Sequence, residues 1–219
     1  MPSLTLTFDN GPEPEVTPHV LDVLARRRLK TTFFVIGEKL RDPSRRALAE
    51  RAHAEGHWIG NHTYTHTIPL GELAPSKACE EIDRTQELIG DLAHPDRLFR
   101  PFGGEGRIGP HLLSHEAADH LAAGGYSVVV WNAIPRDWEP DGWVERALGQ
   151  IEGRDEILMV LHDVPSGAMR ELNRFLDGIA EAGIELRQDI PAGLMPIRRG
   201  HVALPLDPYV GAPGAAVAT

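Results

Sequence analysis

Residues 3–37, SLTLTFDNGPEPEVTPHVLDVLARRRLKTTFFVIG, contain the pattern that decides the fold. Residues 4–8 alternate Leu and Phe with Thr, which is typical of a strand with one buried face. Residues 17–28 space apolar side chains as on one face of a helix, with Pro18 near its start. Residues 32–36 form a short apolar run, typical of a buried strand. This order predicts a βαβ unit with parallel strands.

The same alternation continues outward from this unit to about residue 190. Strand patterns alternate with helix patterns, the strands at 58–60, 98–100, 127–131, 156–161 and 184–186 and the helices at 42–56, 76–90, 110–124, 143–151 and 168–182. Repetition of the unit predicts an α/β barrel or an open parallel sheet. We expect one domain over residues 1–200. Residues 201–219 are rich in Pro, Gly and Ala, and we expect a loosely packed tail there.

Composition excludes several classes of protein. The chain has 22 basic and 32 acidic residues, a net charge of −10, which argues against a nucleic-acid-binding surface and against attraction to a membrane surface. The single Cys79 rules out an intramolecular disulfide and a cysteine-based zinc site. No apolar run reaches the roughly 18 residues of a membrane span, and residues 1–10 lack the pattern of a signal peptide. We therefore expect a cytoplasmic protein without a membrane partner.

Chemistry-bearing residues follow the predicted strands. In α/β barrels and open sheets, the working side chains lie at the carboxyl ends of strands. Here this rule collects five segments: DNGP at 9–12, NHTYTH at 61–66, PFGG at 101–104, Asn132 with RDW at 136–138, and HD at 162–163. We expect these acids, imidazoles and glycine-rich turns to converge on one face.

His62 and His66 provide the strongest metal signal. Side chains four residues apart on a helical turn point the same way, so both imidazoles could reach one divalent ion. The spacing alone also fits two surface histidines. A third ligand from another strand end would complete the site, and Asp9 and Asn10 are the nearest candidates. His162 is either a core or capping histidine, or an acid that acts with a carboxylate base in a hydrolase.

Two further features allow two interpretations each. Phe102 and the glycines after it form either a simple turn or a loop that donates a backbone N–H to an oxyanion. Trp138 either packs in the core or stacks on a sugar ring.

Taken together, these segments resemble the polysaccharide deacetylase family, also called the NodB-homology domain or carbohydrate esterase family four. The resemblance covers about residues 4–190 and is carried, in the family's order, by TFDNGPEPEVTPHVLDVL, TTFFVIGE, EGHWIGNHTYTH, FRPFGG, RDW and LMVLHD. It implies a distorted (β/α) barrel as the catalytic domain. It also implies metal-dependent hydrolysis of N-acetyl groups on amino sugars, or of O-acetyl esters in some members. The expected partner is therefore an acetylated amino-sugar oligosaccharide or polysaccharide, and the net charge fits a neutral or amine-bearing glycan.

The resemblance also implies roles for individual residues. Asp9 corresponds to the catalytic base and His162 to the acid that protonates the leaving amine. Asn10, His62 and His66 correspond to ligands of a divalent metal, expected to be Zn²⁺.

Four supporting residues are implied in the same way. Arg100 would orient the base, and the backbone N–H of Phe102 would stabilise the oxyanion. Leu161 would line the pocket for the acetyl methyl group, and Trp138 would contact the substrate.

The chain departs from the family pattern at the site itself. Asn10 stands where the family has a second aspartate, and a neutral amide should bind a divalent cation more weakly. Ile134 stands where the family commonly has an aspartate four residues before Trp138, so we expect a lower pKa for His162. Asp163 is a candidate to compensate. The RPFGG segment is one residue shorter than usual, which bears on the alignment of Phe102.

Two alternatives remain open at this stage. Asn10 is compatible with a metal-independent hydrolase of a non-peptide C–N bond in a small amide, as in allantoinase-like relatives. The chain could also be a non-catalytic sugar-binding homologue, although such a module would not need Asp9, His62, His66 and His162 together. The sequence specifies neither the substrate nor the oligomeric state.

Overall fold

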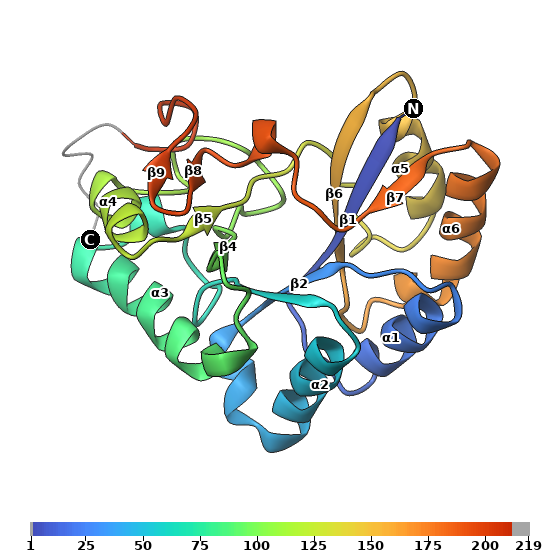
Figure 1. Cartoon of the computed structure of the whole chain (residues 1–219), viewed down its shortest axis with the longest axis horizontal. Helices are drawn as coiled ribbons and strands as arrows, with labels where there is room; N and C mark the ends of the chain where they lie inside the picture. Colours follow the sequence, from blue (N-terminus) through green and yellow to red (C-terminus); the bar gives the residue numbers. More distant parts are fainter. Residues whose placement is uncertain (1, 212–219) are drawn as a thin grey trace.

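The computed structural model describes residues 2–211, and its central strand is β1 (Ser3–Asp9) (Figure 1). One edge of β1 pairs in parallel with β6 (Glu156–His162) along its whole length. The other edge pairs with β7 (Glu185–Arg187) at its start and with β2 (Thr32–Val35) at its end. The parallel register places Asp9 beside His162 at the carboxyl ends of two neighbouring strands.

The sheet continues from β2 and curls. In the described residues the strand order is β6-β1-β2-β3-β4-β5-β8-β9, where the new strands are β3 (Trp58–Asn61), β4 (Leu98–Phe99), β5 (Ser127–Val128), β8 (Ile197–Arg198) and β9 (His201–Val202). The segment after β5 returns to β6, where Ala133 bridges Met159 and the Val160 N–H donates to the Ala133 carbonyl at 3.0 Å. This contact gives the expected distorted barrel.

Helices cover the outside of the curled sheet (Figure 1). They are α1 (Thr17–Arg26), α2 (Pro43–Ala54), α3 (Pro75–Ile89), α4 (His115–Ala123), α5 (Trp143–Ile151) and α6 (Leu172–Glu181), with 3₁₀ turns at η1 (Gly37–Arg41), η2 (Leu70–Glu72), η3 (Gly90–Leu92), η4 (Ala168–Glu171) and η5 (Ala192–Leu194). Alternation along β1 sends Leu4, Leu6 and Phe8 into the core shared with the helices. Thr7 and Asp9 therefore face the opposite side, the interior of the curled sheet.

The expected strands and helices are present, but several bounds differ. The strand expected over residues 127–131 ends at Val128, and the helix expected over residues 168–182 begins as the 3₁₀ turn η4 before α6. Helix α4 begins at His115, so residues 110–114 are not helical as the sequence suggested. The antiparallel hairpin β8–β9 was not expected, because strands of two residues are too short to show a period.

The expectation of a loose tail is wrong for its first part. Residues 201–202 form β9, and the Leu113 N–H donates to the Tyr209 carbonyl at 3.0 Å. Val210 is buried and belongs to the core around α4. The remainder of the expected tail, residues 212–219, lies outside the described residues.

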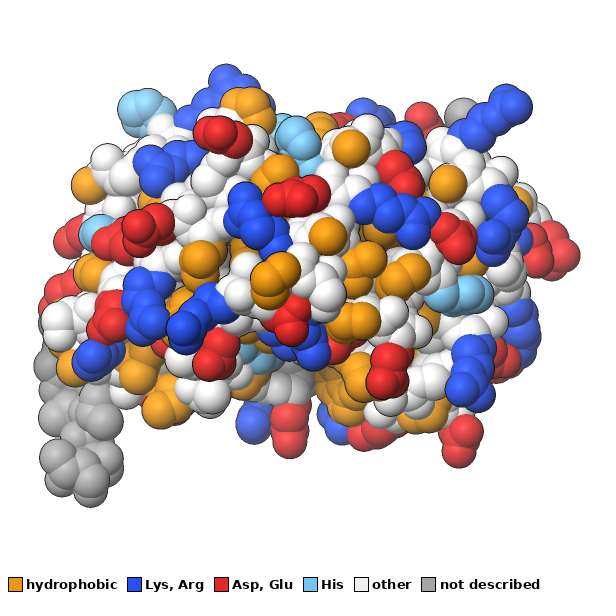
Figure 2. Space-filling model, turned by 90° about the horizontal axis from the view of Figure 1, so that it is seen from below, with side chains coloured by type: hydrophobic (Ala, Val, Ile, Leu, Met, Phe, Trp, Pro, Cys, Tyr) orange, Lys and Arg blue, Asp and Glu red, His pale blue; other side chains and the backbone are white. Residues whose placement is uncertain are grey.

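Within residues 2–211, no helix combines the length and the apolar character that crossing a membrane would require. On the face shown in Figure 2, basic and acidic side chains are interspersed and form no single-sign patch.

Candidate active site

A cavity of about 240 Å³ opens where the strands end. Seven of the nine residues assigned a role from the sequence line it, namely Asp9, Asn10, His62, His66, Phe102, Trp138 and His162. The rest of the wall is formed by Pro101, the backbone turn 103–106, Trp131, Ile134, Val160 and Val164. The convergence expected from the strand-end rule is therefore present.

Asp9 is held by Arg100 beneath the cavity. The fully buried Arg100 donates from Nη1 to Asp9 Oδ1 at 2.8 Å and to Thr7 Oγ1 at 2.7 Å. Its guanidinium also lies 4.0 Å from the ring centroid of Phe34. A buried, ion-paired carboxylate has few orientations available. This contact restricts the orientation of Asp9, and the role of Arg100 in orienting a catalytic base stays a prediction.

His62 and His66 point their Nε2 atoms at each other. The two atoms are 3.1 Å apart, and His62 Nε2 is also 3.5 Å from Asp9 Oδ2. His62 Nδ1 lies 2.8 Å from the Arg100 carbonyl, which can only accept, so Nδ1 carries the proton and Nε2 keeps its lone pair. Burial lowers the pKa of His62 to about 3 and that of His66 to about 2, so both rings are neutral.

Asn10 lies in a turn whose backbone accepts hydrogen bonds from two basic side chains, Lys39 and Arg45. Its backbone has a φ of 75°, a left-handed conformation that asparagine tolerates better than most residues. Lys39 Nζ donates to the Asn10 carbonyl at 2.6 Å, and Arg45 Nη1 donates to the Pro12 carbonyl at 2.9 Å. Glu13 forms ion pairs with both cations. The backbone of this turn is therefore anchored from η1 and α2.

The side-chain oxygen of Asn10, unlike its backbone carbonyl, has no hydrogen-bond partner among the described residues. This Oδ1 atom is buried. A buried unpaired acceptor is costly, so an electropositive partner would stabilise it.

The donor atoms at this site fit a divalent metal. No group of three His, Cys, Asp or Glu side chains in residues 2–211 could hold an ion. Two neutral imidazoles face each other through their Nε2 atoms, however, and Asn10, whose amide oxygen has no partner among the described residues, lines the same cavity. Imidazole nitrogens with an oxygen donor suit zinc.

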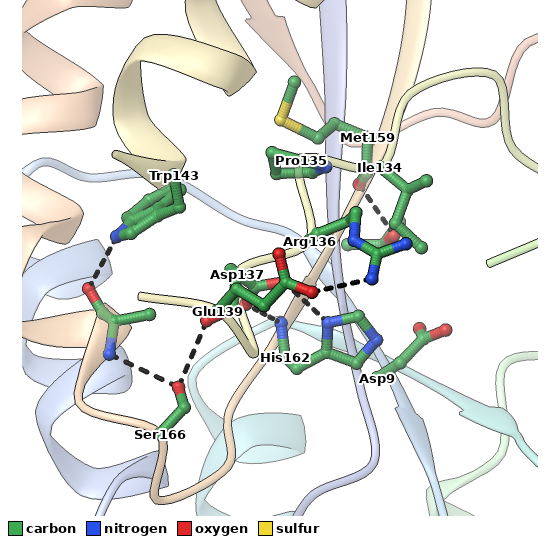
Figure 3. A network of polar contacts seen from close by, with 12 residues as sticks. Asp9, Ile134, Pro135, Arg136, Asp137, Glu139, Trp143, Met159, His162 and Ser166 are labelled. Carbon is green, nitrogen blue, oxygen red and sulfur yellow. Dashed lines mark hydrogen bonds and ion pairs between the residues drawn. The ribbon is translucent and has the colours of Figure 1, made fainter. Parts of the chain in front are cut away.

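His162 is paired with Asp137, a partner that the sequence did not assign. Asp137 Oδ1 accepts from His162 Nδ1 at 2.7 Å, and Oδ2 accepts from the His162 backbone N–H at 2.7 Å (Figure 3). Asp137 is fully buried, so its charge acts at low dielectric.

The pKa of His162 is raised, which corrects the expectation built on Ile134. Burial lowers this pKa, but the charge and hydrogen bond of Asp137 outweigh it, with smaller contributions from Asp9 and Asp163. The absence of a carboxylate at Ile134 therefore does not lower the pKa of His162. Ile134 instead lines the cavity as part of an apolar wall.

Asp163 does not take the place expected of a compensating carboxylate. It is fully buried and accepts from the Thr17 hydroxyl, and among the described residues it forms no hydrogen bond with the His162 ring, whose pKa it raises only through its charge. Its carboxylate lies so close to Gly11 that a Cβ there would be 2.2 Å from Oδ2. Burial raises the pKa of Asp163 to about 7.

The assignment of Leu161 to the pocket is wrong. Neighbouring side chains on a strand point to opposite faces, so if His162 faces the cavity, Leu161 must face away. Leu161 is fully buried in the core under the helices. Val160, two residues before His162, lines the cavity instead.

Phe102 and Trp138 lie at the cavity as aromatic walls. The Phe102 ring centroid is 4.1 Å from that of His66, and the Trp138 ring meets His162 edge-on at 5.2 Å. Both can contact a substrate from these positions. The role of the Phe102 backbone N–H in stabilising an oxyanion stays a prediction.

Sequence reasoning thus missed the roles of Asp137 and Val160. The signal for Asp137 was present, because it belongs to the RDW segment collected at the strand ends. The signal for Val160 was strand alternation: side chains two residues apart face the same side, so Val160 faces the cavity with His162.

The family comparison agrees with the geometry. A family model described as polysaccharide deacetylase matches residues 1–122, more than half of the chain. The chain is 37% identical over 172 residues to a chitooligosaccharide deacetylase of Rhizobium leguminosarum bv. phaseoli, covering 74% of this chain and 68% of that protein. It is 32% identical over 165 residues to a peptidoglycan-N-acetylglucosamine deacetylase of Bacillus cereus, covering 73% and 72%.

The fold has a similar counterpart among solved structures. A family 4 carbohydrate esterase from Streptomyces lividans, in complex with acetate, superposes with a TM-score of 0.71. The sequences are 26% identical, and the match covers 89% of this chain and 96% of that one.

Proposed function

This chain belongs to the polysaccharide deacetylase family, and on that premise we propose that it is a metal-dependent hydrolase that removes acetyl groups from a carbohydrate. The observation that carries the proposal is the convergence of Asp9, His62, His66 and His162 on one cavity. The relatives named as deacetylases of chitooligosaccharide and peptidoglycan support an N-acetylated amino sugar as the substrate.

The reaction needs a base and an acid, and the site has one of each. The Asp9 carboxylate, aligned by Arg100, takes a proton from the water that attacks the acetyl carbonyl carbon. His162, held by Asp137, gives a proton to the amine nitrogen as the C–N bond breaks. The products are acetate and a free amino group.

A metal would be held by Nε2 of His62 and His66 and by Oδ1 of Asn10. Bound there, a Zn²⁺ ion would supply Lewis-acid polarisation of the acetyl carbonyl oxygen. The low pKa values of the two histidines keep both rings neutral at neutral pH, and a neutral imidazole can offer a nitrogen lone pair to a metal without losing a charge-bearing proton. The neutral donor set leaves the site with one carboxylate fewer than the family pattern implies, so we expect weakened metal binding.

The walls of the cavity are consistent with an acetylated sugar. Trp131, Ile134, Val160 and Val164 make an apolar side that suits a methyl group. Trp138 offers an aromatic surface on which a sugar ring can pack. O-acetyl esters of a carbohydrate would place the same carbonyl at the same residues.

The test is acetate release from N-acetylated chitooligosaccharides, followed by mass spectrometry of the products. Metal-stripped protein should be inactive and should regain turnover when Zn²⁺ is restored. Asp9→Ala and His162→Ala should each lower kcat by about 10²- to 10⁴-fold. Glu181→Gln, a change on the exposed end of α6, serves as the control. Unchanged acetate release by both site variants would show that the mechanism is wrong.

Asn10 supports a second candidate function. With an amide in place of a carboxylate, the site could act without a metal on the C–N bond of a small non-sugar amide. Full activity of chelator-treated, metal-free protein on a small amide panel, with no release of acetate from sugars, would favour this candidate. Saturable oligosaccharide binding with no turnover at all would favour a non-catalytic sugar-binding protein.

A further inference from the structure

The turn that joins His62 to His66 has an unusual backbone. Thr63 and His66 have φ angles of 65° and 55°, in the left-handed region that side chains with a Cβ disfavour. Such a turn persists only where its surroundings determine it. Its conformation decides whether the two Nε2 atoms meet, so the contacts that hold it bear directly on the site.

Part of this support comes from the barrel side. Asn61 Oδ1 accepts from the Thr63 N–H at 3.0 Å. The carbonyls of Thr63 and Tyr64 accept from the N–H groups of Gly37 and Glu38, each at 3.0 Å. These bonds leave the N–H groups of residues 64 and 65 to find an acceptor elsewhere.

Glu81 on helix α3 supplies that acceptor. Its Oε2 accepts from the N–H groups of Tyr64 and Thr65, each at 2.8 Å. Its Oε1 accepts from the Thr65 hydroxyl at 2.9 Å. Hydrogen bonds to a carboxylate are stronger than those between neutral groups, and three of them converge here on two consecutive residues.

Helix α3 is a rigid base for this carboxylate. A Cβ at Gly37 would lie 2.4 Å from Thr85 Oγ1, so α3 packs directly against η1. Asn61 Nδ2 donates to the Ile82 carbonyl at 2.9 Å, which ties the end of β3 to the same helix. The Arg84 guanidinium also lies over the Tyr64 ring, 3.7 Å from its centroid. Glu81 therefore connects the turn to a fixed element.

We propose that Glu81 is a positioning residue for the metal site: its carboxylate fixes residues 64–65 so that His66 Nε2 meets His62 Nε2. The proposal rests on the proposed function, because the convergence matters most if the two imidazoles hold a metal. Glu81 does not line the cavity, so its effect passes through the turn.

The first test measures Zn²⁺ affinity by competition with a chromophoric chelator. Glu81→Ala should weaken Zn²⁺ binding by about 10- to 100-fold, as loss of such supporting contacts usually does. Glu81→Gln should stay within a few-fold of the wild type, because its Oε1 can accept both N–H groups and its Nε2 can donate to the Thr65 hydroxyl. Glu87→Gln, an exposed change on the same helix, is the matched control and should have no effect. Wild-type affinity in Glu81→Ala would overturn the proposal.

The second test separates this proposal from the proposed function. Crystal structures of the metal-free wild type and of Glu81→Ala should show the Nε2 atoms at about 3.1 Å in the first and separated in the second. If the wild type binds no Zn²⁺, the metal-dependent function fails, and these two structures alone decide the role of Glu81. An unchanged conformation of residues 62–66 in Glu81→Ala would overturn the proposed role of Glu81. If Glu81→Ala does not fold, Glu81→Asp replaces it in both tests, since its shorter carboxylate cannot reach both N–H groups.

Discussion

At the scale of single residues, the site combines one weakened position with one that is stronger than the sequence suggested. Asn10 offers a neutral oxygen to a cation, although its carbonyl is well anchored by Lys39. His162 has a fully buried carboxylate partner in Asp137. Metal binding and proton transfer are therefore expected to respond differently to substitution.

Asn10→Asp is expected to tighten Zn²⁺ binding roughly tenfold or more, because it adds a negative charge to the ligand set. Competition titration with a chelator would measure the change. Asn10→Ala is the matched control and should weaken binding, since it removes the orphaned Oδ1. Equal affinities for the wild type and Asn10→Asp would show that residue 10 is not a ligand.

Asp137→Asn is expected to move the alkaline limb of the kcat–pH profile to lower pH. A general acid must be protonated, so activity falls as pH rises through the pKa of His162. Asp137 raises that pKa, and its neutral replacement lowers it. At alkaline pH the loss in kcat should reach about 100-fold or more.

The pH profile of Asp137→Asn is to be compared with that of Asp141→Asn, an exposed neighbour whose profile should match the wild type. An alkaline limb that does not move in Asp137→Asn would contradict the assigned partnership.

At the scale of elements, strand β6 has one face toward the cavity and the other toward the core under the helices. Val160 and His162 face the cavity, whereas Met159 and Leu161 belong to the core under the helices. The period of two makes these assignments mutually dependent. A role given to Leu161 in the pocket could not coexist with a role for His162.

Substitutions at Leu161 and Val160 should separate stability from substrate binding. Leu161→Ala should lower the free energy of unfolding by about 2–5 kcal/mol and leave KM nearly unchanged. Val160→Ala should change KM, because it enlarges the cavity that receives the substrate. It should lower the free energy of unfolding by less than Leu161→Ala does. Urea unfolding and steady-state kinetics would measure the two effects. If KM rose in Leu161→Ala but not in Val160→Ala, the assignment of Val160 to the cavity and Leu161 to the core would be wrong.

At the scale of the whole molecule, buried histidines tie the stability of the fold to pH. His57, His62 and His66 are neutral inside the protein, and burial is the main cause of each lowered pKa. His57 is the most useful probe, since it lies away from the cavity, where it accepts from the Thr31 N–H at 3.1 Å. Asp163 has the opposite effect on stability. Its pKa is raised in the folded protein, so its contribution to the free energy of unfolding increases as pH falls.

The metal-free protein should lose stability as pH falls from about 6.5 toward 4. Burial lowers the pKa of His57 to about 4, so in this range the unfolded chain binds a proton that the folded chain excludes. His57 alone should account for about 2 kcal/mol between pH 7 and pH 5. Urea unfolding at the two pH values measures the difference.

His57→Asn is the matched variant for this measurement, because its Oδ1 can still accept from the Thr31 N–H while the titrating group is gone. It should show a correspondingly smaller change in stability between the two pH values. The same pH dependence in both proteins would rule out His57 as a source.

Local patterns in the sequence were enough to determine the alternating βαβ architecture and the set of residues at the strand ends. The patterns work because strand and helix periods are properties of consecutive residues, and because parallel strands bring their carboxyl ends to one side. For this reason the sequence alone is enough to assign Asp9, His62, His66 and His162 to one end of the sheet.

Only the tertiary structure decided which groups act on one another across the barrel. Asp137 is 25 residues from His162, and Arg100 is 91 residues from Asp9, so no local pattern links either pair. The pKa values likewise depend on burial and on charges from distant segments. The contact of the tail with Leu113 and the contact of Glu81 with residues 64–65 are of the same kind. Both join segments that meet only when the chain has folded.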